Sequence, residues 1–275
     1  CSAAWYTPRP GWEGPSMALV PVKVDLSTKT CVVTGASSGI GLALVTQLLA
    51  HSQVAQVHAI ARRAEHSAAL QALRNEHGDR LLCCAMDITD AHSRQLGVAR
   101  ITHRSAQLHC LIHAAGVLHA PDIRPEKSIN QLNEPALVQL LQVNAIAPIL
   151  LTQALLPAFR QAPAGVIAAI SARVGSISDN ALGGWYSYRA SKAAQNQLFR
   201  TLSIEVRRSH PNLRVVSLHP GTVDTPLAAP FKANVAADRL FTPALSATHL
   251  LRVIAGLHNE DSGQFFAWDG QAIPW

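Results

Sequence analysis

The sequence has few charged residues and few aromatic ones. Charged side chains make up 15% of its 275 residues and aromatic ones 5%, whereas hydrophobic residues make up 48%. No run of like charges is long enough to suggest a disordered tail, so the composition indicates a packed globular protein. A single α/β domain of this length can bury most of its surface. We therefore expect one domain over residues 24–275, preceded by an N-terminal extension over residues 1–23.

The chain also lacks a concentrated block of positive charge. Its formal net charge is +6, but the 23 Lys and Arg residues are scattered along it. Scattered charge argues against nucleic acid as a partner, because a nucleic-acid-binding surface needs basic residues gathered on one face. A modest positive excess suits an anionic small molecule such as a phosphorylated cofactor.

Membrane and export signals are also expected to be absent. No uncharged apolar segment is expected to approach the ~20 residues of a membrane helix, and residues 1–16 contain no apolar signal-peptide core. Met17 is a candidate natural start, and a lipid on Cys1 after a removed leader is the alternative. Four of the five cysteines lie in or beside apolar, strand-like runs. We therefore expect reduced thiols and a cytoplasmic location, and no metal site.

Apolar runs alternate with helix-length segments along the rest of the chain. The expected strands span residues 30–33, 54–61, 81–86, 108–113, 166–171, 214–219 and 264–268, and the expected helices include 41–50, 134–161 and 188–208. Strands that are apolar on both faces and separated by helices form βαβ units around a buried parallel sheet. The pattern predicts a doubly wound α/β fold.

The stretch TCVVTGASSGIGLALVTQLLA, residues 30–50, carries the first candidate site. Its apolar start predicts a strand that ends at Thr34, and a helical pattern follows. Gly35, Gly39 and Gly41 fall at the turn, where the chain must bend tightly and let a ligand approach the backbone. The helix would point its N-terminal N–H groups at that turn, which favours a pyrophosphate there. A glycine-rich turn that binds nothing is the alternative, because the spacing differs from the common Gly-x-Gly-x-x-Gly fingerprint.

The end of the second strand, at Ala61, indicates which dinucleotide is bound. An acidic residue there would hold a free ribose 2′-hydroxyl, whereas an arginine accepts a 2′-phosphate. Arg62 and Arg63 follow Ala61, and Glu65 comes slightly late to be the acid. This favours NADP(H) over NAD(H), with two solvated arginines at a helix start as the alternative. Asp87, at the end of the third strand, is a candidate acceptor for the adenine amino group or the N-cap of the next helix.

Tyr188 and Lys192 form the second candidate site. They lie four residues apart in a segment predicted to be helical, and Asn196 follows one turn later, so the side chains share a face. A phenol has a pKa of ~10, and a neighbouring ammonium together with a cationic nicotinamide favours the phenolate. Tyr188 is therefore a candidate general acid–base. The alternative is a core tyrosine on an amphipathic helix beside a lysine that extends to solvent.

Taken together, TGASSGIG at residues 34–41 and YRASK at residues 188–192 resemble the short-chain dehydrogenase/reductase family. The resemblance covers nearly the whole chain from about Val24. Within that family, SARVGSISDNALGGWYSYRASKAA and the C-terminal SGQFFAWDGQAIPW are similar to a bacterial subgroup named after a cell-to-cell signalling protein, the C-factor. The resemblance implies a Rossmann-type three-layer α/β/α sandwich with a seven-stranded parallel sheet. It also implies hydride transfer between an NAD(P) nicotinamide and a carbonyl or alcohol.

The same resemblance implies roles for individual residues. Tyr188 would protonate the carbonyl oxygen, and Lys192 would bind the nicotinamide ribose and lower the tyrosine pKa. Asn144 would hold a water that links the lysine to a proton relay, or alternatively it satisfies a local helix carbonyl. The other residues expected at the nucleotide are Gly35, Ser37, Ser38, Gly39, Ile40, Gly41, Arg62, Arg63, Asp87, Ile88, Ala115, Gly116, Pro220, Gly221, Val223 and Thr225.

Two positions depart from the family pattern. Ala114 replaces the second asparagine of Asn-Asn-Ala-Gly, and Ala172 stands where the catalytic serine belongs. Ser171 is the candidate replacement, although adjacent strand residues point to opposite faces unless the strand is already turning there. Ser176, which lies beyond a glycine, is the other candidate. The third possibility is that neither serine replaces the missing hydroxyl.

Residues 226–242 are expected to form a substrate loop. The loop contains Leu227, Phe231, Leu240 and Phe241 and few charges, which favours an apolar carbonyl or alcohol over a charged one. Alternatively, these side chains pack the loop onto its own domain.

The leading hypothesis is an NADP(H)-dependent oxidoreductase, and the resemblance implies a homodimer or homotetramer formed through the helices that flank Asn144 and Tyr188. The rival is a dinucleotide-binding signalling or regulatory protein with weak or no catalysis. Ala172 and Ala114 favour the rival, whereas Tyr188, Lys192 and Asn144 favour the enzyme.

Overall fold

The computed structural model describes residues 29–160, 162, 164–229, 236 and 239–275. The expected N-terminal extension over residues 1–23 and part of the expected substrate loop lie outside the described residues.

Seven parallel strands form the central sheet in the order β3-β2-β1-β4-β5-β6-β9. They are β1 (Lys29–Thr34), β2 (Val54–Ala61), β3 (Leu81–Ala85), β4 (Cys110–His113), β5 (Gly165–Ile170), β6 (Leu213–His219) and β9 (Phe265–Ala267). Each matches an expected strand to within two residues, so the predicted fold class is confirmed. β1 pairs with both β2 and β4, and the strand order reverses there. In doubly wound sheets, ligands bind at the carboxyl end of that switch point.

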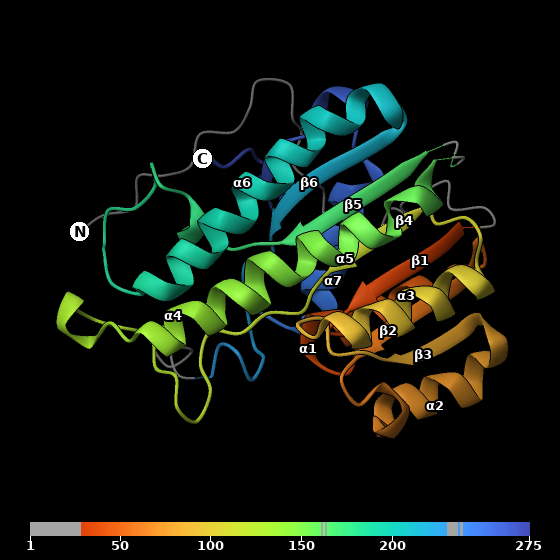
Figure 1. Cartoon of the computed structure of the whole chain (residues 1–275), viewed down its shortest axis with the longest axis horizontal. Helices are drawn as coiled ribbons and strands as arrows, with labels where there is room; N and C mark the ends of the chain where they lie inside the picture. Colours follow the sequence, from red (N-terminus) through yellow and green to blue (C-terminus); the bar gives the residue numbers. More distant parts are fainter. Residues whose placement is uncertain (1–28, 161, 163, 230–235, 237–238) are drawn as a thin grey trace.

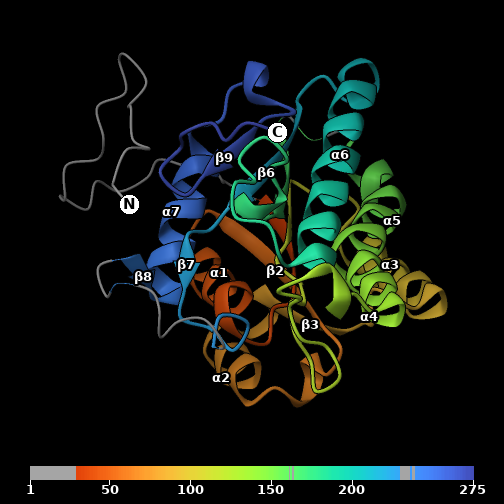
Figure 2. The same cartoon turned by 90° about the vertical axis from the view of Figure 1, so that its left-hand side faces the viewer.

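Helices cover both faces of the sheet. They are α1 (Gly39–Ala50), α2 (Ala68–His77), α3 (Ala91–Arg104), α4 (Glu134–Leu141), α5 (Ala147–Leu155), α6 (Tyr186–Ser209) and α7 (Pro243–Ala255). Figure 1 labels the helices and strands, and in Figure 2 α1 and α7 lie on one side of the sheet while α3, α5 and α6 lie on the other. Separate apolar clusters fill the two interfaces, one around Val33, Leu48 and Leu250 and one around Leu111, Leu151 and Phe199. This is the three-layer α/β/α arrangement expected from the resemblance.

The expected single helix over residues 134–161 is interrupted. A π-helical turn over Gln142–Ile146 separates α4 from α5. Such turns insert an extra residue into the helix and are frequent at functional sites. The turn contains Asn144, which is fully buried. Gln161, the expected end, lies outside the described residues.

This helical region also corrects one expectation from the sequence. Glu134–Phe159 spans 26 residues with a mean hydropathy of 1.5, so a segment of membrane-span length and composition is present after all. Of its most apolar window, 44% is buried inside the fold, and Leu151 and Leu155 of α5 are among the residues that pack in the core. A core helix passes the same test of length and composition, so the segment is weak support for a membrane span.

The four cysteines that the structure describes, Cys31, Cys83, Cys84 and Cys110, are all free thiols. Three of them are buried, as expected for small apolar residues in strands.

Candidate active site

A cavity of about 1110 Å³ opens at the carboxyl ends of the strands, beside the switch point between β1 and β4. The β1–α1 turn, the ends of β2 and β3, the loop after β4, helix α6 and the loop after β6 all line it. Sixteen of the residues expected at the site contribute to its wall: Gly35, Ser37, Ser38, Gly39, Ile40, Gly41, Arg62, Asp87, Ile88, Ala115, Gly116, Ser171, Tyr188, Lys192, Pro220 and Thr225. Residues as far apart in the sequence as Gly35 and Thr225 therefore meet at one cavity.

The glycines of the β1–α1 turn are required by close backbone contacts. A Cβ on Gly41 would lie 2.2 Å from the carbonyl oxygen of Gly35. Gly35 itself has φ +66°, and a Cβ there would lie 2.7 Å from the backbone nitrogen of Ala115. Helix α1 begins next to this turn, its N-cap Ser38 makes no side-chain capping bond, and its first turn contains no acidic residue. The positive end of α1 is thus open toward the cavity, which suits the pyrophosphate of a dinucleotide.

The two arginines after β2 differ in their position relative to the cavity. Both are exposed, but Arg62 lines the cavity whereas Arg63 does not and instead precedes a 3₁₀ turn over Ala64–His66. Asp87 also lines the cavity, and its Oδ1 accepts hydrogen bonds from the Thr89 hydroxyl at 2.6 Å and the Thr89 N–H at 2.9 Å. These bonds lower the pKa of Asp87, and the charges of Arg62 and Arg94 lower it further. The N-cap of α3 is Asp90, so the alternative capping role for Asp87 is wrong.

Tyr188 and Lys192 meet on the buried face of α6. Tyr188 is 7% exposed and Lys192 3%, and the Lys192 Nζ lies 5.9 Å from the centre of the Tyr188 ring. The Nζ donates to the carbonyl oxygen of Ile170 at 2.8 Å and to Oε1 of Gln195 at 3.1 Å. Both residues line the cavity, with one helical turn between them.

Burial controls the ionisation of this pair. It raises the pKa of the Tyr188 phenol well above its ordinary value and lowers the pKa of Lys192 to about 7. From the sequence, the ammonium together with a cationic nicotinamide was expected to lower the pKa of the phenol. For the protein by itself the shift is in the opposite direction, because burial disfavours the charged phenolate.

Asn144 lies behind the cavity wall and fixes the loop after β4. Its Oδ1 accepts from the Val117 N–H at 2.8 Å, and its Nδ2 donates to the Val117 carbonyl oxygen at 2.8 Å and the Ser191 hydroxyl at 3.0 Å. A Cβ on Gly116 would lie 3.4 Å from Asn144 Oδ1 and 3.7 Å from Lys192 Nζ. The side chain therefore tethers the loop to α6, and a water held by Asn144 stays a prediction.

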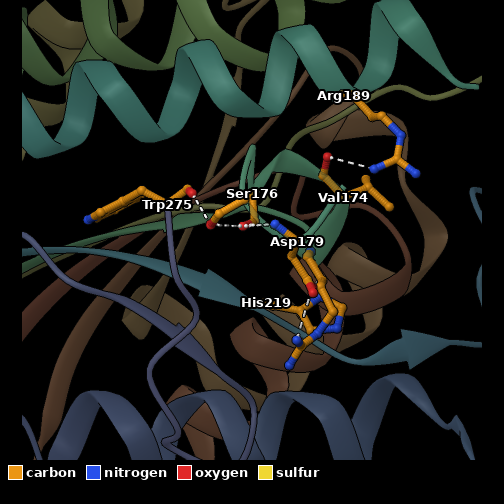
Figure 3. Close-up of polar contacts among 8 residues, drawn as sticks. Val174, Ser176, Asp179, Arg189, His219 and Trp275 are labelled. Atoms are coloured by element: carbon orange, nitrogen blue, oxygen red, sulfur yellow. Dashed lines mark hydrogen bonds and ion pairs between the residues drawn. The ribbon is translucent and has the colours of Figure 1, made fainter. Parts of the chain in front are cut away.

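The serine hydroxyls near β5 differ in what they face. Ser171 lines the cavity, is 2% exposed, and its Oγ has no hydrogen-bond partner among the residues that the structure describes. Ala172 packs in the apolar cluster around Tyr188. Ser176 instead accepts from the Asp179 N–H at 3.2 Å, in the loop that also contacts the Trp275 carbonyl (Figure 3). Of the candidate hydroxyls, only that of Ser171 lies on the cavity wall.

The loop after β6 is held by aromatic packing. Pro220 and Thr225 line the cavity, whereas Gly221 and Val223 do not. Gly221 has φ +80°, and a Cβ there would lie 2.6 Å from the Phe241 ring.

Two short parallel strands, β7 (Thr222–Val223) and β8 (Leu240–Phe241), close the base of the expected substrate loop. The Phe241 ring packs edge-on against Trp268, with ring centroids 4.8 Å apart. Phe241 therefore packs on its own domain, as the alternative interpretation of this loop predicted. Leu227 lines the cavity as expected, and Phe231 lies outside the described residues.

The sequence argument missed the apolar wall that the loop after β4 contributes. Leu118, His119, Ala120 and Pro121 line the cavity, and Leu118 and Ala120 belong to the same apolar cluster as Leu227. His119 Nε2 donates to the carbonyl oxygen of Pro226 at 2.9 Å and so joins this loop to the substrate loop. No motif marks these residues. Their position directly after Gly116, which was expected at the nucleotide, could have indicated that they lie near the cavity.

A dinucleotide-sized cavity at the switch point of a Rossmann-type sheet, with a buried Tyr-x-x-x-Lys pair on its wall, defines a class of nucleotide-dependent oxidoreductases. The family model described as short chain dehydrogenase matches residues 29–236. The chain belongs to the short-chain dehydrogenase/reductase family, enzymes that act on CH–OH and C=O groups.

Individual relatives are similar over about half of the chain or more of it, depending on the protein. The C-signal protein of Myxococcus xanthus is 39% identical over 133 residues, which is 48% of this chain and 75% of that protein. A benzil reductase ((S)-benzoin forming) of Saccharomyces cerevisiae is 30% identical over 79% of this chain and 80% of its own. The NADPH-bound carbonyl reductase from chicken fatty liver is 32% identical, with a TM-score of 0.81 over 94% of this chain and 100% of that one.

Proposed function

We propose that this chain is an NADP(H)-dependent carbonyl reductase in which Tyr188 exchanges the proton of the substrate oxygen. The single observation that carries the proposal is the buried pair of Tyr188 and Lys192 on the wall of the cavity that the glycine turn also lines.

The residues around the glycine turn fit a phosphorylated dinucleotide. The open N-terminus of α1 would hold the pyrophosphate, and the exposed Arg62 would hold the 2′-phosphate at the end of β2. The NADPH of the chicken carbonyl reductase supports this preference. When bound, the reduced nicotinamide supplies a hydride to the carbonyl carbon.

Tyr188 would give its phenolic proton to the carbonyl oxygen as the carbon is reduced. The raised pKa of Tyr188 keeps the phenol protonated at neutral pH, which suits an acid in the reductive direction. Lys192, with a pKa of about 7, would return a proton through the ribose it holds. The unpartnered Oγ of Ser171 would donate to the same oxygen and replace the hydroxyl that Ala172 lacks.

The proposed substrate is an apolar or aromatic carbonyl compound. Leu118, Pro121, Pro226 and Leu227 form the wall on the substrate side. A pocket lined in this way orients an apolar molecule through few polar groups. The similarity to a benzil reductase supports an aromatic ketone as the first compound to test.

The test is NADPH oxidation with a panel of aldehydes, ketones and quinones, repeated with NADH and with Tyr188→Phe. We expect turnover with at least one apolar carbonyl, a preference for NADPH that Arg62→Ala weakens, and loss of turnover in Tyr188→Phe. NADPH binding without turnover on any compound would contradict the proposal.

NADPH binding without turnover would favour a second candidate function, that of a nucleotide-binding signalling or regulatory protein. Two observations favour it: the similarity to C-signal and the alanine at position 172. The unpartnered Ser171 hydroxyl on the cavity wall argues for the enzyme instead.

We also propose a cytoplasmic homodimer or homotetramer. The free thiols of the described cysteines agree with a reducing compartment. Exposed apolar side chains on the helices that flank Asn144 and Tyr188, Ile146 (40%) and Ile204 (55%), provide a contact surface. Light scattering of the purified protein tests the assembly, and a monomer at micromolar concentration would contradict it.

A further inference from the structure

Helix α6, which carries Tyr188, begins in an unusual backbone conformation. Gly183, Gly184 and Trp185 all have positive φ, at +65°, +66° and +54°, and Trp185 is the N-cap of the helix. A tryptophan in the left-handed region costs free energy, so surrounding contacts must hold it there. The Trp185 side chain makes no capping bond to the first turn. The cap therefore has to come from elsewhere in the chain.

Glu126 supplies that cap from the loop between β4 and α4, 61 residues away in sequence. One oxygen of its carboxylate accepts a hydrogen bond from the Ser187 hydroxyl, and the other accepts from the Ser187 N–H at 3.3 Å. Its carbonyl oxygen accepts from the Trp185 N–H at 2.5 Å. The side chain is 3% exposed. Three contacts thus join one buried residue to the first turn of α6.

The positive end of the helix is what stabilises this buried carboxylate. No ion pair to Glu126 occurs among the residues that the structure describes. A buried carboxylate without a cation is costly unless N–H and O–H donors and a helix N-terminus compensate it. Ser187 provides both kinds of donor.

Neighbouring contacts limit how this junction can move. A Cβ on Gly184 would lie 3.2 Å from the Glu126 carbonyl oxygen. The Arg189 guanidinium donates to the carbonyl oxygens of Gly184 at 3.0 Å and Gly183 at 3.2 Å, and Figure 3 shows it reaching Val174 as well. The Trp185 ring packs edge-on against Tyr188, with centroids 6.3 Å apart. Trp185, whose N–H bonds to the Glu126 carbonyl oxygen, therefore contacts the Tyr188 ring directly.

We propose that Glu126 is a positioning residue, which fixes the Tyr188 phenol relative to the substrate side of the cavity through Ser187 and the first turn of α6. The inference rests on the role of Tyr188 in the proposed function. The loop that contains Glu126 also contributes Leu118 and Pro121 to the cavity wall, a few residues earlier. Glu126 thus links the wall that contacts the substrate to the helix that supplies the proton.

The test compares Glu126→Gln, Ser187→Ala and the double variant with the wild type, using NADPH and the best carbonyl compound of the panel. Displacement of a reacting group by about 1 Å can cost about 100-fold in rate. We expect kcat to fall about 10- to 100-fold in each single variant, while the KM for the carbonyl and the Kd for NADPH stay within about twofold. Because both variants weaken the same contact between Glu126 and Ser187, the double variant should be no slower than the slower single one.

Glu205→Gln is the matched control, since Glu205 is exposed on the same helix. Unchanged kcat in Ser187→Ala and Glu126→Gln would overturn the inference, as would additive losses in the double variant or an equal loss of NADPH affinity. If Glu126→Gln does not fold, Ser187→Ala alone decides by its kcat. Wild-type rates in Tyr188→Phe would instead refute the proposed function, whereas an inactive Tyr188→Phe beside fully active Glu126 and Ser187 variants would refute only this inference.

Discussion

At the scale of single residues, burial determines the chemistry of the site. Tyr188 and Lys192 are nearly inaccessible, and the same desolvation raises the pKa of the phenol and lowers that of the ammonium to about 7. Each group is therefore shifted toward its neutral form. A neutral phenol beside an amine that titrates near neutrality is suited to passing a proton toward a substrate oxygen.

Ser171 provides the sharpest prediction at this scale. Ser171→Ala should lower kcat about 100-fold, because a hydroxyl aimed at a developing oxyanion is lost. Steady-state kinetics with the carbonyl panel measure the effect. Ser176→Ala is the control, since that hydroxyl bonds within its own loop, and its kcat should stay within about twofold. Equal losses in both variants would show that Ser171 has no special role.

At the scale of elements, the strand–turn–helix units were readable from sequence. Strands buried on both faces and the glycine turn predicted the β1–α1 unit and the sheet, since their side-chain patterns are local. The π-helical turn at Gln142–Ile146 was not predicted, because no residue type marks it. It follows from how Asn144 is held by Val117 and Ser191, which are distant in sequence.

Gly41→Ala tests the phosphate-binding turn as an element. The added Cβ would meet the Gly35 carbonyl oxygen at 2.2 Å, so β1 and α1 must separate. We expect NADPH affinity to fall at least about tenfold and the free energy of unfolding to fall by about 1–3 kcal/mol. Fluorescence titration and urea unfolding measure the two effects.

Gly256→Ala is the matched control, because the nearest atom to its Cβ would be 3.6 Å away and its φ is −85°. NADPH affinity should be unchanged in this variant. A Gly41→Ala protein that binds NADPH like the wild type would contradict the role of the turn.

At the scale of the whole molecule, the cavity gathers residues from the turn after β1 to the loop after β6. The sequence predicted most of its nucleotide side, because motifs with fixed spacing occur there. The substrate side was predicted less well: Leu118 and His119 carry no motif, and Phe241 proved to pack on Trp268. The contact between Glu126 and Ser187 could not be predicted from sequence, because it joins the loop after β4 to the first turn of α6, and only the fold brings these two segments together.

The buried histidines predict an acid-sensitive fold. Burial lowers the pKa of His58 to about 4, and burial together with the Lys192 charge lowers that of His113 to about 3, both from about 6.5. As the pH falls, these histidines take up protons in the unfolded chain at a higher pH than in the folded protein. Their contribution to the free energy of unfolding is therefore fully present above pH ~6.5 and is lost as the pH falls toward 4. Urea unfolding at several pH values should show this fall. In His58→Gln the fall should be smaller, and an identical pH dependence would contradict the assignment.

The central claim, that the Tyr188 phenol supplies the proton in a hydride transfer, is tested most directly by a single turnover with NADPH that carries deuterium at both C4 positions. The wild type should place deuterium on the carbonyl carbon of an apolar ketone. Tyr188→Phe should bind NADPH with unchanged affinity but transfer deuterium at least about 1,000-fold more slowly, since it lacks the acid. Transfer at the wild-type rate in Tyr188→Phe would contradict the account.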